Sequence, residues 1–248
     1  MQPMEQFTIK PIVPLHIGGY DVSFTNQSLL MVVVALAAAS FLTVAMGGRR
    51  LVPSRAQSMA EMSYEFVANM INASAGQDGL KFFPFVFTLF VFVLFSNFFG
   101  MIPGSFTVTS QIAVTFALAS LVILTVIVTG FATHGIGFLK LFVPKAPWYL
   151  LILLVPIEVI SFLTRPISLS VRLFANMLAG HTMLAVFGGF VVLLGGAGGV
   201  LSVLSIAPMA LIVAIMLLEL LVAFLQAYVF AILTCIYLNE ALHLHDHH

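Results

Sequence analysis

Long runs of apolar residues recur along this chain, and they restrict its fold more than any other feature. A helix needs about 20 mostly apolar residues to cross the hydrocarbon core of a bilayer. Three runs have that length, at residues 29–46, 82–102 and 112–133, and each is predicted to cross once. Only 7% of all residues are charged, against about 25% in a soluble domain. The sequence therefore predicts an all-α, polytopic integral membrane protein with a single membrane domain over residues 1–248.

Two further apolar segments, at residues 148–187 and 200–238, are too long for upright spans. Each would extend roughly 60 Å as one straight helix, about twice the thickness of the hydrocarbon core. Such segments either break or cross the membrane at a steep tilt. We expect two long, steeply tilted helices that pack against each other as a C-terminal hairpin.

The segment at residues 53–75 has a different character. Ser54 followed by Gln57 is typical of a helix start, and Gly76 is a plausible stop. Apolar side chains fall on one face of this helix, namely Met59, Met62, Phe66, Met70 and Ala73, and polar side chains fall largely on another, namely Glu61, Glu65, Asn69 and Asn72. This pattern predicts an amphipathic helix that lies in the membrane interface. An ordinary solvated helix is the alternative.

The positive charges of the loops indicate an orientation. The first and third loops carry the basic residues, which are Arg49, Arg50, Arg55, Lys81, Lys140 and Lys145. The second and fourth loops, predicted at residues 103–111 and 188–199, have no lysine or arginine, and glycines in the fourth suggest flexibility. Basic loops are retained on the cytoplasmic or matrix side. We therefore expect the amino terminus outside and the carboxyl terminus inside.

Ionisable residues occur within the two longest apolar segments, where they are costly. An arginine at mid-bilayer costs about 2.5–3.5 kcal/mol on insertion scales. Glu158, Arg165 and Arg172 are spaced by seven residues and so form one polar stripe along a helix. Glu158 and Arg165 could instead form a paired or snorkelling helix end. His181, nine residues after Arg172, points to roughly the opposite side.

The last apolar segment adds a second polar pair. Glu219 and Gln226 are also seven residues apart, and Asn176 lies one turn after Arg172 on the preceding segment. His181 and Glu219 could form a static hydrogen bond between helices. They could equally pass protons, since burial and neighbouring groups readily tune the proton affinities of both residue types.

Other function classes find little support in the sequence. It has no phosphate-binding glycine loop, no metal-ligand constellation and no nucleophile elbow. The formal net charge of zero gives no electrostatic case for nucleic acid, and the single Cys235 excludes a disulfide framework. The tail, with His243, His245, Asp246, His247 and His248, could bind a metal in vitro but is expected to be a solvated terminus. We expect no cofactor, no resident metal and no catalysis by this chain alone.

One motif closely resembles a known signature. Residues 166–181 read P-I-S-L-S-V-R-L-F-A-N-M-L-A-G-H, and residues 225–230 read L-Q-A-Y-V-F. Both are similar to segments of the subunit a family of F-type ATP synthases, which carries an essential arginine within R-L-F-x-N-M-x-A-G. The segments at residues 3–7 and 23–26 also resemble mitochondrial members and their bacterial relatives, so the resemblance covers nearly the whole chain.

The resemblance implies roles for particular residues. Arg172 would face the rotating ring of c subunits. The half-channel from the proton-rich side would be lined or flanked by Glu219, His181, Asn176 and Gln226, and the other half-channel would lie near Glu158, with Ser168 a weaker candidate. Some bacterial members carry the acid and the histidine at exchanged positions, which preserves both chemistries.

The resemblance also implies partners and a location. The partners would be the c-ring, the peripheral-stalk b subunits, the remainder of the ATP synthase and membrane lipid. A bacterial inner membrane is favoured, with a mitochondrial inner membrane as the alternative. A secondary ion transporter and a structural subunit of a respiratory complex are rival interpretations. A transporter would be expected to show paired repeats with broken helices in both halves, and the first half has no counterpart of Arg172.

Overall fold

The computed structural model describes residues 11–14, 16–17, 20–21, 23–48, 53–102, 108–143 and 147–243. Within these residues, five helical segments are long and apolar enough to cross a membrane. The predicted all-α, polytopic class is therefore confirmed. The basic residues Arg49, Arg50 and Lys145, on which the predicted orientation partly depends, lie outside the described residues.

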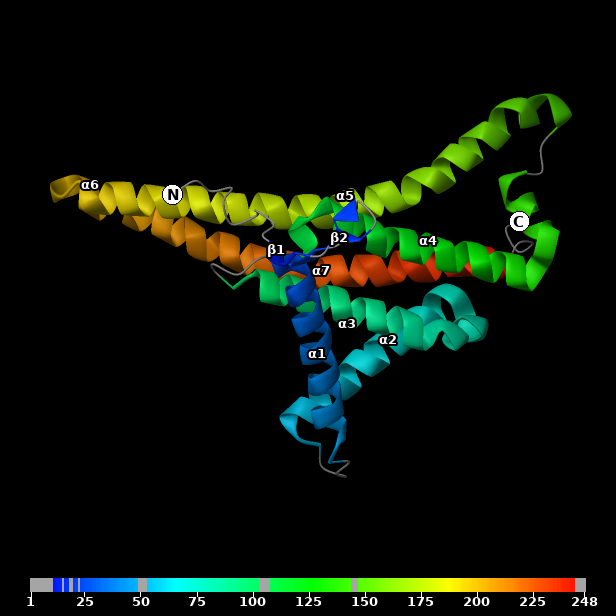
Figure 1. Cartoon of the computed structure of the whole chain (residues 1–248), viewed down its shortest axis with the longest axis horizontal. Coiled ribbons are helices and arrows are strands. Elements are labelled where there is room, and N and C mark those ends of the chain that lie inside the picture. The colour runs from blue at the N-terminus through cyan, green and yellow to red at the C-terminus, as the bar shows by residue number, and fades with distance from the viewer. Residues whose placement is uncertain are drawn as a thin grey trace. The chain divides into compact units, whose positions relative to one another are not determined.

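Helices make up nearly all of the described chain (Figure 1). The α-helices are α1 (Asn26–Met46), α2 (Arg55–Gly79), α3 (Phe83–Gly100), α4 (Ile112–His134), α5 (Trp148–Gly196), α6 (Gly199–Leu204) and α7 (Ile206–Leu242). The 3₁₀ helices are η2 (Leu80–Phe82), η3 (Val108–Ser110) and η4 (Gly135–Phe142). Short strands not anticipated from the sequence form two antiparallel pairs, β1 (Pro11–Val13) with β4 (Phe24–Thr25) and β2 (His16–Ile17) with β3 (Tyr20–Asp21).

The predicted fourth loop at residues 188–199 is wrong over most of its length. Helix α5 continues from residue 187 to Gly196, and only Ala197 and Gly198 separate it from α6. Glycine within a helix costs only about 1 kcal/mol relative to alanine. The apolar residues 190–194 between the glycine pairs continue the membrane-compatible run, which outweighs that cost.

The last long helix also differs from the predicted range of 200–238. Ser205 separates the short α6 from α7, and α7 then continues to Leu242. At this end the Nε2 atom of His134 lies 3.0 Å from the carbonyl oxygen of Leu242. The imidazole thereby contacts one of the carbonyl groups that a helix end leaves without an intrahelical partner.

Helix α2 begins as predicted and ends later. The side chain of Ser54 accepts a hydrogen bond from the Gln57 backbone N–H, at 3.3 Å. Gly76, the predicted stop, has a left-handed φ of 66°, and helical structure resumes beyond it to Gly79. On the predicted apolar face, Met59 is exposed and Met70 is buried. The location of α2 in the membrane interface stays a prediction.

The chain packs as two units. The first contains Met1–Phe41, Phe92–Gln111 and Leu173–Ala227. Within it, the later part of α5 pairs antiparallel with the first part of α7, because Asn176 meets Gln226 while His181, farther along α5, meets the earlier Glu219. Apolar side chains fill the surrounding core, including Leu173, Met177, Ala223 and Ala227.

The second unit contains Leu42–Val91, Ile112–Arg172 and Tyr228–His248. Its core is rich in aromatic side chains, since Phe90, Phe138 and Phe230 are almost fully buried. Phe138 of η4 packs directly on Gly130 of α4, where any larger residue would collide with the ring. In this unit the first part of α5 contacts the last part of α7 through Arg165 and Glu240.

Candidate functional site

A buried histidine and a buried carboxylate meet in the first unit. The Nε2 atom of His181 on α5 lies 3.7 Å from Oε1 of Glu219 on α7. The two residues are only 8% and 6% exposed. The separation is longer than a hydrogen bond, so the two groups are close enough to interact electrostatically without being locked together by a short contact.

Gly180 allows this approach. A Cβ atom at position 180 would lie 2.7 Å from Oε1 and 3.0 Å from Cδ of Glu219. Carbon atoms do not come that close to non-bonded side chains without displacement. The missing side chain at position 180 is therefore what lets the carboxylate lie beside α5.

Two polar side chains of α7 are incompletely satisfied by the chain itself. Among the described residues, neither carboxylate oxygen of Glu219 has a hydrogen-bond partner. Gln226 accepts a hydrogen bond from Nδ2 of Asn176 at 3.1 Å, while its own amide nitrogen finds no partner in the same part of the chain. Buried polar groups are costly unless they are paired. Their retention together on one helix is typical of a site that handles ions or protons.

A further polar contact in this unit was not predicted from the sequence. Asn97 on α3 is fully buried, donates a hydrogen bond to the carbonyl oxygen of Ala223 at 3.1 Å and accepts one from Thr109, also at 3.1 Å. Ala223 lies one turn after Glu219 on α7. Asn97 therefore fixes α3 and η3 against the helix that carries the carboxylate. The available signal was an asparagine within a phenylalanine-rich run.

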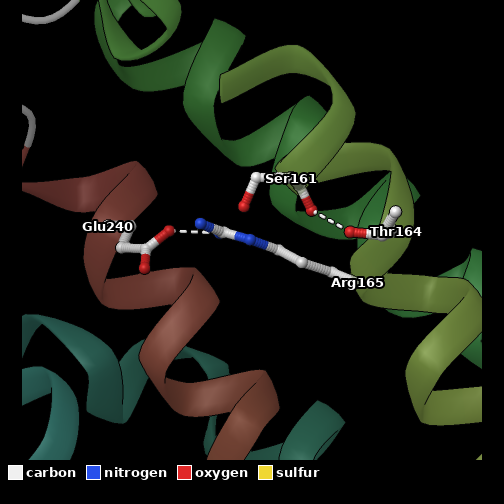
Figure 2. A network of polar contacts seen from close by, with 4 residues as sticks. All are labelled: Ser161, Thr164, Arg165 and Glu240. Atoms are coloured by element: carbon white, nitrogen blue, oxygen red, sulfur yellow. Dashed lines mark hydrogen bonds and ion pairs between the residues drawn. The ribbon is translucent and has the colours of Figure 1, made fainter. Parts of the chain in front are cut away.

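The second unit contains an ion pair between the long helices. Arg165 of α5 donates a hydrogen bond to the carboxylate of Glu240 of α7 and forms an ion pair with it, as Figure 2 shows. The guanidinium also lies over the rings of Phe162 and Tyr237, 5.5 and 4.9 Å from their centroids. Glu240 was missed because it follows the predicted end of the last helix. The alternative was a paired or snorkelling helix end formed by Glu158 and Arg165; the structure shows Arg165 paired, but with Glu240 of another helix and not with Glu158.

Arg172 has a different environment from Arg165. It is exposed, and within the described part of the chain it forms no ion pair or hydrogen bond. Glu158 is half-buried and Ser168 is exposed. The neighbouring Ser170 is instead buried and shares a hydrogen bond of 3.0 Å with Thr115 of α4. The charged stripe therefore combines a paired arginine with an accessible one.

The residues of the histidine-rich tail fall mostly outside the described structure. His243 is described, and its Nδ1 atom lies 2.8 Å from Oδ1 of Asn239. Residues 244–248 lie outside the described residues. Over the ranges that are described, no group of three or more histidine, cysteine or acidic side chains could hold a metal ion.

Comparisons with known proteins give a consistent result. The family model described as ATP synthase A chain matches residues 28–239. The chain is 62% identical over 244 residues to the ATP synthase subunit a of Mesorhizobium japonicum, which covers 98% of this chain and 97% of that protein. It is 62% identical to the Allorhizobium ampelinum protein of the same name and 60% identical to that of Rhizobium meliloti, each over 242 residues, or 97% of both chains.

Proposed function

Because this chain belongs to the ATP synthase A chain family, we propose that it is the stator subunit whose Arg172 couples proton flow to rotation of a ring of c subunits. It is a proton-translocating component of the membrane sector and is not catalytic alone. The complex as a whole makes ATP, and this chain supplies the ion path.

The accessibility of Arg172 carries the proposal. An arginine within an apolar helix is expensive and normally pairs with another group of the same protein. In the described residues Arg172 forms no ion pair, whereas Arg165 on the same helix has Glu240. Its guanidinium is permanently charged. It is therefore available to a carboxylate that another subunit presents.

Glu219 and His181 suit the entry branch of the proton path. A glutamate and a histidine can each hold and release a proton. The hydrogen-bonded pair of Asn176 and Gln226 adds a second polar contact between the same two helices. A proton entering here would pass to a carboxylate of the ring and neutralise it. The neutral carboxyl group can then move into lipid, because most of its desolvation cost has gone.

Glu158 and Ser168 suit the release branch. After nearly a full turn of the ring, the carboxyl group would reach the side of Arg172 where Glu158 lies and lose its proton. Arg172 between the two branches favours the ionised ring carboxylate and obstructs direct passage of protons. Net flow then requires rotation, which drives ATP formation.

The proposed partners follow from this role. A rotor ring must lie against the exposed face of Arg172, and b subunits of a peripheral stalk must hold the chain against the torque. The compared relatives come from bacteria. A bacterial inner membrane is thus the proposed location.

Replacement of Arg172 tests the proposal. In inverted membrane vesicles that contain the whole complex, Arg172→Ala should abolish ATP-driven proton pumping and proton-driven ATP synthesis. Arg55→Ala removes an exposed arginine at the start of α2 and is the matched control. Pumping at the control rate by an assembled Arg172→Ala complex would refute the proposed role.

A further inference from the structure

The Arg165–Glu240 pair is built into the second unit with several supports. The side chains are 21% and 25% exposed, and the guanidinium lies over two aromatic rings as well as against the carboxylate. The hydroxyl group of Thr164, the neighbour of Arg165, donates a hydrogen bond to the carbonyl oxygen of Ser161 at 2.8 Å (Figure 2). The hydroxyl group does not compete for Glu240. The carboxylate and the rings together hold the guanidinium toward α7.

By regular helix geometry, Arg165 and Arg172 would lie on nearly the same face of α5. Seven residues correspond to about 10.5 Å along a helix, with an angular offset of only about 20°. Both side chains remain charged at all relevant pH values. Tyr237 on α7 is within electrostatic range of Arg165, Glu240 and Arg172, so these charges share one region of the second unit.

Two unpaired arginines on one stripe would compete for the same ring carboxylate, which would interfere with the proposed function. A ring carboxylate that passes the stripe would meet two cations of similar chemistry, and binding to the first would compete with binding to the second. A carboxylate held on Arg165 removes that competition. Specific binding of the ring carboxylate to Arg172 thus depends on suppressing its binding to Arg165 as well as on the presence of Arg172.

We propose that Glu240 is a positioning residue that sequesters Arg165, so that a rotor carboxylate meets Arg172 as the only uncompensated cation of the stripe formed by Glu158, Arg165 and Arg172. This inference rests on the proposed function. A need for packing alone would not require charge here, since apolar residues often replace a buried ion pair without loss of stability. The charge of Glu240 is what matters.

Three variants of the complete complex in inverted membrane vesicles test the inference: Glu240→Gln, Glu240→Asp and the double variant that combines Glu240→Gln with Arg165→Gln. Glu240→Gln frees Arg165 and should lower ATP-driven proton pumping roughly tenfold, a size typical of coupling between neighbouring charges. The double variant removes both charges and should restore pumping to within about twofold of wild type. Glu240→Asp keeps the negative charge and should therefore also pump protons at a rate within about twofold of wild type.

A matched control breaks a different ion pair of the same chain. Asp78→Asn removes the exposed pair with Lys81, 3.1 Å long, and should leave pumping unchanged. A double variant that pumps as poorly as Glu240→Gln, in complexes of normal abundance, would overturn the inference, because the carboxylate itself would then be required. If Glu240→Gln does not accumulate in the membrane, the double variant alone tests the inference. Normal pumping by the double variant would then support it, and lost pumping would overturn it. Arg172→Ala, measured in parallel, reports on the proposed function independently.

Discussion

Glu219 packs directly on the backbone of Gly180, the residue that precedes its partner His181. The carboxylate therefore has a defined place beside α5 that depends on a missing side chain. Because the atoms in contact belong to the end of a flexible side chain, an added methyl group would displace the carboxylate more readily than it would separate the helices.

Gly180→Ala should consequently impair function while preserving the fold. Displacement of a reacting group by about 1 Å can reduce a rate up to about 100-fold, and we expect proton pumping to fall roughly tenfold with normal amounts of assembled complex. Gly188→Ala is the matched control on the same helix, since a Cβ atom there meets nothing within 4 Å. Equal pumping by the two variants would show that the position of the carboxylate is unimportant.

Glu219→Gln removes the ability to exchange a proton while preserving size. We expect proton pumping to fall by roughly 100-fold, as is common when a positioned acid–base group is lost. The rate of ATP-driven acidification in vesicles is the measurement. Glu65→Gln, which neutralises an exposed glutamate of α2, should pump normally. A wild-type rate for Glu219→Gln would exclude this carboxylate from the proton path.

Asn97→Ala should reduce stability. The substitution removes two buried hydrogen bonds, to Ala223 and from Thr109, and leaves a small cavity. We expect the free energy of unfolding to fall by about 2 kcal/mol, visible as a lower midpoint for thermal loss of this subunit from the detergent-solubilised complex. Asn72→Ala, at an exposed position of α2, serves as the control. Identical midpoints would show that this contact contributes nothing.

Apolar length predicted the membrane fold well, because bilayer thickness sets a direct requirement on it. The prediction of a loop at residues 188–199 is wrong because it gave the glycines more weight than the apolar run that continues between them. Helix propensity of single residues is a weak signal once a segment lies in an apolar environment. This is why the end of α5 was misplaced.

The candidate site was predictable only where one helix carries the pattern. Spacing by seven residues identified the aligned residues of each long helix, including Arg172 and Glu219. It could not reveal the partner of Arg165, because Glu240 is separated from it by 75 positions in the sequence and belongs to another helix. Asn97 was missed for the same reason, since its partner is a backbone carbonyl group on α7. Contacts between helices depend on packing that periodicity does not encode.

The antiparallel pairing of His181 with Glu219 and of Asn176 with Gln226 also governs which changes in chain length this protein can accept. One residue inserted between Asn176 and His181 would turn the histidine by about 100° relative to the asparagine, and one of the two pairs would be lost. A residue added near Gly198, where α5 gives way to α6, would rotate neither pair. Natural length variation among relatives should therefore concentrate at that turn and be absent from the intervals between paired side chains.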